Sequence, residues 1–243
     1  MTPDATRVCR VVNRVVVITG ATGGVGSALA QVFATDRLVL VGRDPERLAA
    51  LARRHPGSRT VIADLADPAT VGPAVTAALA PAEAVDVLVH NAGVAPRGPV
   101  ADADAIVWSG ALTVNTVAPA VLTAALLPRL RAARGHVVFI GSGQSLAASP
   151  GFGAYAASKF ALRALADALR AEEAGAGIRV TSLFPGRIAT DMQRVLQEDA
   201  HAPYLPERCI DPATFARAVG FAVDAPPDTH LTEITVRPGR PDG

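Results

Sequence analysis

Cysteine is scarce in this sequence of 243 residues, which contains only Cys9 and Cys209. The two cysteines form no CxxC or metal-ligand spacing, so neither a disulfide framework nor a cysteine metal site is predicted. We expect two unpaired thiols, as is usual for a cytoplasmic protein, and no bound metal.

An excess of one charge and a long apolar run are also missing. The net charge is +1, and acidic and basic residues are interleaved, which gives no electrostatic footprint for nucleic acid or a membrane surface. The opening Met1–Arg10 lacks the apolar stretch of a signal peptide. Gly, Arg, Asp or Pro interrupts each apolar run before it could cross a bilayer. We therefore expect a soluble protein.

Apolar residues make up 50% of the chain, enough for a substantial core. Short apolar runs alternate with longer segments rich in Ala and Leu. The expected strands are Val15–Thr19, Leu38–Val41, Val61–Ala63, Val85–His90, Val137–Ile140, Arg179–Phe184 and Ile234–Val236. The expected helices are Val25–Ala34, Asp44–Arg54, Asp67–Ala80, Ala105–Arg131, Ala154–Ala174 and Asp211–Asp224. This order predicts an α/β fold in which helices cover both faces of a parallel sheet.

The chain shows no Ser/Gly-rich linker and no internal repeat. We expect residues 1–13 to form an N-terminal extension, and residues 14–243 to form a single doubly wound, Rossmann-like domain. Two irregular stretches, Gly141–Gly153 and Pro185–Pro212, follow predicted strands. Ligands of such sheets bind beyond the carboxyl ends of the strands, so residues 186–211 are predicted to form a substrate loop or lid.

A glycine-rich segment, Thr19–Gly26, follows the first predicted strand and opens a helix. Glycines allow a tight turn and a close approach to a pyrophosphate, and the helix N-terminus supplies unpaired N–H groups. The alternative is an ordinary strand-to-helix turn. The predicted cofactor contacts in this segment are Gly20, Thr22, Gly23, Gly24, Val25 and Gly26.

The end of the second predicted strand bears on the type of cofactor. Enzymes that select NAD place an acid there for the ribose 2′-hydroxyl, whereas an arginine accommodates the 2′-phosphate of NADP. Here Gly42 stands where the acid is expected, and Arg43 follows. Asp44 and Pro45 read as the cap and first turn of a helix. NADP(H) is therefore favoured over NAD(H), the alternative being that Arg43 is a solvated charge.

A tyrosine and a lysine, Tyr155 and Lys159, are spaced to share one helix face. A nearby ammonium favours the phenolate, so we expect Lys159 to lower the pKa of Tyr155 and make it a general acid and base. Ser142, just past a predicted strand, could bind the substrate oxygen. Taken singly, each residue is as well explained by packing or solvation; their coincidence with the glycine loop points to catalysis.

A polar residue, Asn115, lies inside the long predicted helix Ala105–Arg131. Pro119 has no N–H, so the carbonyl of Asn115 loses its helical partner. We expect a kink there, and a water on that carbonyl that links to Lys159 and passes protons to solvent.

These motifs resemble the short-chain dehydrogenase/reductase family over nearly the whole chain, from about Arg14 to Val236. In order, the matching residues are Thr19–Gly26, Asp64-Leu65, Asn91-Ala92-Gly93, Asn115, Ser142, Tyr155 through Lys159, and Pro185-Gly186 followed by Thr190. The resemblance implies a seven-stranded parallel sheet and a homodimer or homotetramer built through the long helices.

The resemblance also implies roles for individual residues. Tyr155 would be the catalytic acid and base, Lys159 would bind the nicotinamide ribose and tune the tyrosine, Ser142 would orient the carbonyl and Asn115 would belong to the proton relay. The implied cofactor contacts are Asp64 and Leu65 near the adenine, Asn91, Ala92 and Gly93 near the adenosine ribose, and Pro185, Gly186, Ile188 and Thr190 near the nicotinamide. The chain departs from the family at His90, where asparagine is usual, and at Gly23, where some NADP users carry a basic residue.

The favoured function is an NADP(H)-dependent oxidoreductase that transfers a hydride between the nicotinamide and a carbonyl or secondary alcohol, of the carbonyl reductase or alcohol dehydrogenase type. The expected substrate is an apolar ketone or aldehyde, because the candidate walls are mostly apolar: Leu146, Phe152, Met192, Leu196 and Tyr204. One alternative is an epimerase or dehydratase on a related fold, for which the region after Pro185 looks short. The other is a non-catalytic NADP(H)-binding sensor or scaffold.

Overall fold

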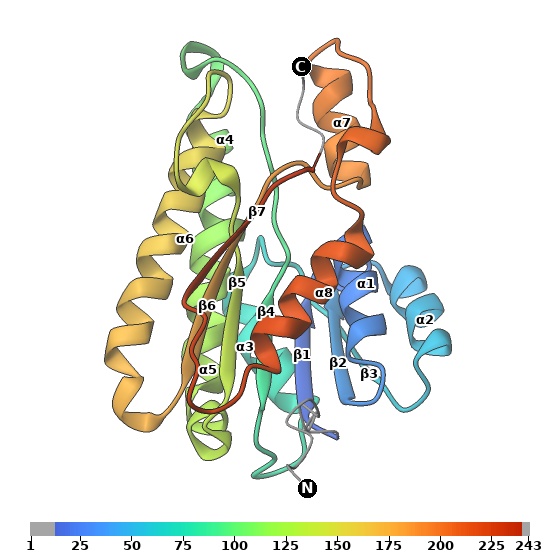
Figure 1. Ribbon diagram of the computed structural model, residues 1–243, viewed down its shortest axis with the longest axis vertical. Coiled ribbons are helices and arrows are strands. Elements are labelled where there is room, and N and C mark those ends of the chain that lie inside the picture. Colours follow the sequence, from blue (N-terminus) through green and yellow to red (C-terminus); the bar gives the residue numbers. More distant parts are fainter. Residues whose placement is uncertain (1–12, 240–243) are drawn as a thin grey trace, which may run out of the picture.

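One parallel sheet organises the molecule. A computed structural model describes residues 13–239 of the chain. The strands are β1 (Val15–Thr19), β2 (Arg37–Gly42), β3 (Arg59–Ile62), β4 (Val87–His90), β5 (His136–Ile140), β6 (Arg179–Pro185) and β7 (Glu233–Val236). They pair in parallel in the order β3-β2-β1-β4-β5-β6-β7 (Figure 1). The predicted doubly wound, seven-stranded α/β fold is confirmed.

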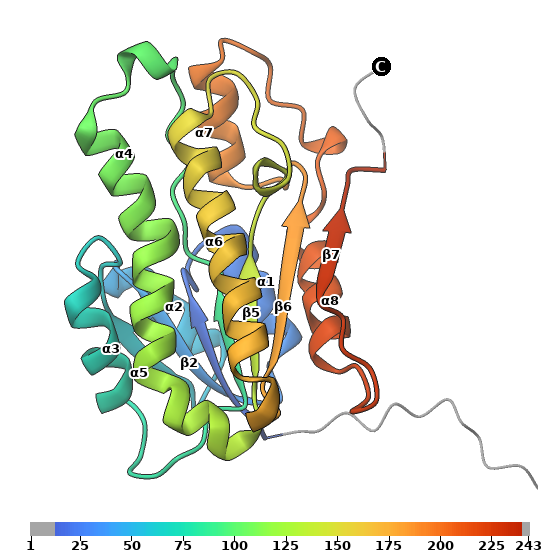
Figure 2. The same cartoon turned by 90° about the vertical axis from the view of Figure 1, so that its left-hand side faces the viewer.

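Helices cover both faces of the sheet (Figures 1 and 2). On one face lie α3 (Pro68–Ala77), α5 (Ala118–Ala133) and α6 (Gly153–Glu172), and on the other α1 (Gly24–Val32), α2 (Pro45–Arg54) and α8 (Pro212–Val223). The remaining helices are α4 (Ala105–Leu112), α7 (Asp191–Asp199), the π-helical η2 (Thr113–Val117), and the short 3₁₀ turns η1 (Val100–Asp102), η3 (Gly143–Ser145), η4 (Ala174–Ala176) and η5 (Pro206–Arg208).

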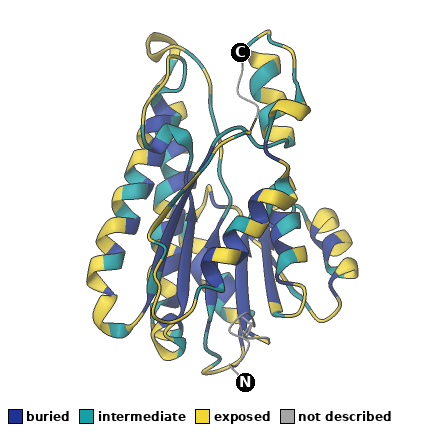
Figure 3. Ribbon diagram, in the orientation of Figure 1, coloured by how far each residue is buried: buried dark blue, intermediate teal, exposed yellow. Residues whose placement is uncertain are grey.

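The core consists of two apolar layers separated by the sheet. Every residue of β1, β4 and β5 is buried, in agreement with the near-continuous apolar runs that predicted strands covered on both sides. Figure 3 shows the buried strands and the exposed outer faces of the helices. A rigid core of this kind fixes the loops at the carboxyl ends of the strands, where the cavity described below lies.

Two features differ from the expected elements. Helix α7 lies within the stretch Pro185–Pro212, for which no helix was predicted. The expected kink near Asn115 takes the form of η2, in which the N–H of Ala118 bonds to the carbonyl of Thr113. The irregularity therefore begins before Pro119, and η2 joins α4 and α5 into one continuous helical stretch.

That helical stretch corrects one expectation from the sequence. By length and composition, Ala105–Ala133 is apolar enough to cross a membrane, since an 18-residue window of it has a mean hydropathy of 1.6. The expectation that no apolar run is long enough was therefore wrong. The core helix of a soluble protein passes the same test. Leu122, Leu126 and Leu130 of this helix are buried against the sheet.

Parts of the terminal predictions lie outside the described residues. These are Cys9 and all of the proposed extension 1–13 except Asn13. Cys209 lies between η5 and α8, where its Sγ donates to the carbonyl of Leu205 at 3.6 Å. Among residues 13–239, no group of three or more His, Cys, Asp or Glu side chains could hold a metal ion.

Candidate active site

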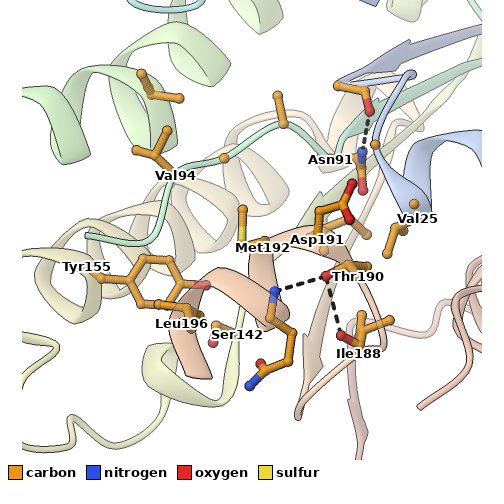
Figure 4. Close-up of a pocket in the computed structure, with 18 of the residues that line it drawn as sticks. Val25, Asn91, Val94, Ser142, Tyr155, Ile188, Thr190, Asp191, Met192 and Leu196 are labelled. Atoms are coloured by element: carbon orange, nitrogen blue, oxygen red, sulfur yellow. Dashed lines mark hydrogen bonds between the residues drawn. The ribbon is translucent and has the colours of Figure 1, made fainter. Parts of the chain in front are cut away.

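A cavity of about 920 Å³ lies at the carboxyl ends of the strands. Its lining comes from the glycine loop after β1, the ends of β2, β4 and β5, the start of α6, and the segment from Pro185 through α7. Figure 4 shows Tyr155 and Ser142 facing this cavity, with Met192 and Leu196 of α7 beside them and Val25 and Asn91 at the far end. One continuous cavity thus joins the glycine loop to the candidate catalytic residues.

The glycine loop has the geometry that a pyrophosphate requires. Gly20 has φ = 62°, and a Cβ there would lie 2.8 Å from the Cα of Ala92, so only glycine fits. A Cβ on Gly26 would clash with the carbonyl oxygen of Gly20. Helix α1 starts at Gly24 with no side-chain cap, and Gly24 and Val25 line the cavity. The first turn of α1 is therefore open to an anion, and the loop fits a dinucleotide.

The loop after β4 is tied to the glycine loop. The side-chain amide of Asn91 donates to the carbonyls of Thr19 and Gly20 at 3.0 and 3.1 Å. The Thr19 hydroxyl accepts from the backbone N–H groups of Asn91 and Ala92, both at 3.1 Å. The side chain of Asn91 therefore holds the glycine loop in place, in addition to lining the cavity.

Two arginines, Arg43 and Arg47, lie just after the end of β2. Arg43 is exposed and lines the cavity, and Gly42 before it leaves no acid at the strand end. Asp44 caps α2 by accepting from the N–H of Arg47 at 3.0 Å, as predicted. The guanidinium of Arg47 donates to the carbonyl of Thr22 at 2.9 Å and also lines the cavity. Sequence reasoning missed Arg47, although its position in the first turn of α2 was a usable signal.

Tyr155 and Ser142 meet inside the cavity. The Ser142 hydroxyl favours the phenolate of Tyr155, but burial outweighs this effect and raises the pKa of Tyr155. The expectation that Lys159 lowers this pKa was wrong, because burial dominates and raises it. Ser142 is held by its neighbours, since its hydroxyl accepts from the N–H of Gln144 and its own N–H donates to Ser145, both at 3.1 Å.

Lys159 lies one helical turn beyond Tyr155 and is 4% exposed. Its ammonium donates to the carbonyl of Ile140 at 2.9 Å and lies 6.0 Å from the centre of the Tyr155 ring. Burial lowers the pKa of Lys159 to about 8. The buried His90, at the end of β4, stacks on Phe139 at 4.9 Å, and burial followed by the charge of Lys159 lowers its pKa to about 3.

Asn115 is fully buried and does not line the cavity. Its side-chain amide donates to the carbonyl of Val94 at 2.8 Å and to the Ser158 hydroxyl at 2.9 Å, and it accepts from the N–H of Val94 at 2.9 Å. A Cβ on Gly93 would lie 2.9 Å from the Asn115 side-chain oxygen and 3.5 Å from the Lys159 ammonium. The side chain therefore positions the loop after β4, which leaves only the backbone carbonyl for the predicted proton relay.

The remaining predicted cofactor contacts surround the same cavity. Of the residues predicted to bind the cofactor, all except Gly26 line it: Gly20, Thr22, Gly23, Gly24, Val25, Arg43, Asp64, Leu65, Asn91, Ala92, Gly93, Tyr155, Lys159, Pro185, Gly186, Ile188 and Thr190. Thr190 also caps α7 by accepting from the N–H of Gln193 at 3.3 Å (Figure 4). Gly26 instead allows α1 to start close to the loop.

The predicted substrate walls divide into two groups. Phe152, Met192 and Leu196 line the cavity, whereas Leu146 and Tyr204 do not. Tyr204 lines a separate pocket of about 20 Å³. Proline-rich chain between α7 and α8 carries Tyr204 away from the cavity, a displacement that the pattern of apolar residues did not reveal. Val94, Arg97, Gln144 and Arg237 line the cavity and were missed, because they sit in loops without a recognisable motif.

Comparison with known proteins agrees with this geometry. Residues 14–201 match the family described as short chain dehydrogenase. The bovine (Bos taurus) dehydrogenase/reductase SDR family member 7B is 44% identical over 193 residues, which cover 74% of this chain and 59% of that protein. The chain thus spans about three fifths of that relative's length.

Two solved structures show the same fold. A putative NAD(P)-dependent gluconate 5-dehydrogenase from Beutenbergia cavernae, with bound NADP, is 31% identical with a TM-score of 0.83, covering 94% of this chain and 97% of that one. A 3-ketoacyl-(acyl-carrier-protein) reductase from Brucella melitensis, complexed with NADH, is 26% identical with a TM-score of 0.82, covering 93% and 98%. The fold, the glycine loop, the positions of Tyr155 and Ser142 in one cavity, and these matches agree: the chain belongs to the short-chain dehydrogenase family.

Proposed function

We propose that the protein is an NADP(H)-dependent carbonyl reductase or alcohol dehydrogenase. The observation that carries this proposal is that Tyr155 and Ser142 face the same cavity as the glycine loop (Figure 4). Hydroxyl groups placed in this way can bind one carbonyl oxygen and donate a proton to it. A sensor or scaffold would not need this pair.

Tyr155, Ser142 and Lys159 would each have a separate role in the reaction. When bound, the nicotinamide supplies or accepts the hydride. Tyr155 donates a proton to the carbonyl oxygen during reduction and removes it from the alcohol during oxidation. Ser142 holds that oxygen, and Lys159 contributes positive charge beside the developing oxyanion. The raised pKa of Tyr155 keeps the phenol protonated at neutral pH, as a general acid requires.

The preference for NADP(H) rests on the end of β2. Solved relatives include one with NADP and one with NADH, so the fold alone does not select the cofactor. Arg43 and Arg47 both line the cavity there, and Gly42 offers no carboxylate to repel a phosphate. A guanidinium binds phosphate through charge-assisted hydrogen bonds, which supports the 2′-phosphate as the ligand.

The substrate is proposed to have an apolar body. Val94, Met192 and Leu196 line the end of the cavity that contains Tyr155 (Figure 4), and the ring of Phe152 lies 6.2 Å from the ring of Tyr155. Met192 and Leu196 belong to α7, so we propose that residues 186–211 act as the lid over this end. Apolar walls favour a ketone, aldehyde or secondary alcohol with a hydrocarbon portion.

We also propose a homodimer or homotetramer built through α4 and α5. Ile106 of α4 is 78% exposed, and the exposed Val107, Val117 and Val121 follow on α4, η2 and α5. Such an apolar surface is typical of a protein interface. Light scattering tests it, with replacement of Val117 and Val121 by aspartate expected to give monomers. A cytoplasmic location stays a prediction, to be tested by cell fractionation.

The function is tested with a panel of ketones, aldehydes and alcohols, each with NADPH and with NADH. We expect turnover of apolar ketones, with higher kcat/KM for NADPH. If the purified protein binds NADPH tightly but turns over no member of the panel in either direction, the sensor or scaffold alternative replaces this proposal.

A further inference from the structure

An arginine from the end of β7 lies beside the catalytic serine. Arg237 follows Val236, the last residue of β7, and lines the same cavity as Ser142 and Tyr155. A methyl group added at Gly143 would lie 2.7 Å from the Nη1 atom of Arg237. The guanidinium therefore lies directly over Gly143, the residue after Ser142, and the absence of a side chain at Gly143 makes room for it.

A second arginine approaches from the opposite wall. The guanidinium of Arg97 lies over the ring of Phe152, 5.2 Å from its centre. The Phe152 ring in turn lies 6.2 Å from the ring of Tyr155. Backbone bonding fixes this loop, because the N–H of Gly98 donates to the carbonyl of Gly151 at 2.9 Å. The two arginines thus flank the candidate catalytic hydroxyls, one on the side of Ser142 and one on the side of Tyr155.

Neither charge is compensated within the described part of the chain. No carboxylate of residues 13–239 forms an ion pair with Arg97 or Arg237. Other arginines of the fold, such as Arg14, Arg59 and Arg194, do pair with a carboxylate. Among residues 13–239, the acids that line the cavity are Asp64 and Asp191. Asp64 accepts from the N–H of Ala66 beyond the end of β3, and the side chain of Asp191 is 82% exposed beside Arg194. The end of the cavity that contains Tyr155 is therefore apolar and cationic.

We propose that the substrate is an oxo acid, or the corresponding hydroxy acid, whose carboxylate pairs with Arg237. The inference rests on the proposed function and narrows its substrate class. Arg237 lies over Gly143, the residue next to Ser142. The carboxylate of the substrate is therefore separated from its reacting carbonyl by few carbon atoms. Arg97 adds positive charge from the Phe152 side, and the hydrocarbon portion of the substrate contacts Met192 and Leu196.

The reaction balances without involving the carboxylate. In reduction, the carbonyl carbon gains a hydride from NADPH, which is oxidised to NADP⁺, and the carbonyl oxygen gains the proton of Tyr155. The product is a hydroxy acid, and the carboxylate stays ionised and paired throughout. A guanidinium and a carboxylate form two parallel hydrogen bonds, so this pair also fixes which face of the ketone meets the nicotinamide.

The test compares aliphatic 2-oxo and 4-oxo acids with their methyl esters, which keep the shape and remove the charge. The variants are Arg237→Met and Arg97→Met, with Arg217→Met on the exposed face of α8 as the matched control. We expect the native protein to prefer acid over ester. Arg237→Met should lower the ratio of kcat/KM for acid over ester about 10- to 100-fold, the loss expected for a charged hydrogen bond. Arg97→Met should lower it less, and Arg217→Met should keep the native ratio.

A binding measurement separates this inference from the proposed function. Calorimetry with the NADP⁺-loaded Tyr155→Phe variant should show binding of the oxo acid that is lost when Arg237→Met is added. The inference is overturned if esters are turned over as well as acids, or if Arg237→Met weakens NADPH binding and leaves the ratio unchanged. If no carbonyl compound is turned over at all, the proposed function fails instead.

Discussion

The ammonium of Lys159 lies 6.0 Å from the centre of the Tyr155 ring and is held there by the carbonyl of Ile140. This arrangement places the ammonium group of Lys159 beside the phenol that we propose as the general acid. Burial lowers the pKa of Lys159 to about 8 and raises that of Tyr155. Among these two groups, the lysine therefore loses its proton first as the pH rises.

The pH dependence of reduction follows from this order. Lys159 is charged below its pKa of about 8 and neutral above it, so kcat/KM for reduction should fall above about pH 8, approaching tenfold per pH unit. Lys159→Arg, which stays charged, should shift this fall upward, and Lys159→Met should lose activity at every pH. A profile that stays flat to pH 10 in the native protein would exclude Lys159 as the group that titrates.

Cofactor selection should depend on two arginines. Removing Arg43 or Arg47 should raise the KM for NADPH about tenfold each, because each loses a charge-assisted contact worth roughly 1.5–3 kcal/mol. The KM for NADH should change little, since NADH has no 2′-phosphate. Arg53→Ala, on the same helix α2, is the control. Equal effects on both cofactors would show that these arginines do not bind the 2′-phosphate.

Stability in acid should depend on His90. Burial lowers the pKa of His90 to about 3 in the folded protein, against about 6.5 when unfolded. The unfolded chain therefore binds more protons between these two values, and the free energy of unfolding decreases as the pH falls from 6.5 towards 3. The full shift corresponds to roughly 5 kcal/mol.

Urea unfolding between pH 7 and pH 4 measures this contribution. His90→Asn should give a shallower decrease than the native protein, whereas the exposed His201→Asn should leave it as steep. Comparing slopes avoids the problem that removing the contacts of His90 with Phe139 and Thr123 lowers stability at every pH. Identical slopes for His90→Asn and the native protein would contradict the assignment.

Pro119 provides a test of the proton relay. Alanine there restores an N–H that can bond to the carbonyl of Asn115 and compete with the predicted water. Pro119→Ala should keep the fold and slow the proton-transfer step, seen as a larger solvent isotope effect and a changed pH profile. Pro128→Ala, further along α5, is the control. If turnover and pH dependence do not change, Asn115 has a structural role only.

The layers of the fold were predictable because strands buried on both faces leave near-continuous apolar runs. For β1, the predicted bounds Val15–Thr19 are the observed ones. Helix α7 was missed because its flanks are rich in proline and no side chain of α7 is buried. A usable signal was Thr190 three residues before Gln193, since Ser or Thr followed by Glu or Gln at that spacing marks a helix start.

Some residues of the candidate site could be predicted from the sequence and others could not. Residues in motifs, such as Tyr155 and Ser142, were placed together correctly by reasoning that strand ends share one edge of the sheet. Arg97 and Arg237 belong to loops, and only the folded chain shows that they face one cavity. The π-helical segment η2 was also beyond sequence reasoning, because Pro119 marks an irregularity without indicating its form.

The mechanism is tested most directly by Tyr155→Phe, which removes one oxygen atom and keeps the ring. Single-turnover reduction of the best ketone by NADPH should be slowed on the order of 10²- to 10⁴-fold. NADPH binding, measured by fluorescence titration, should stay within a few-fold of the native value. A Tyr155→Phe variant that reduces the ketone at the native rate would contradict the central claim that this phenol is the proton donor.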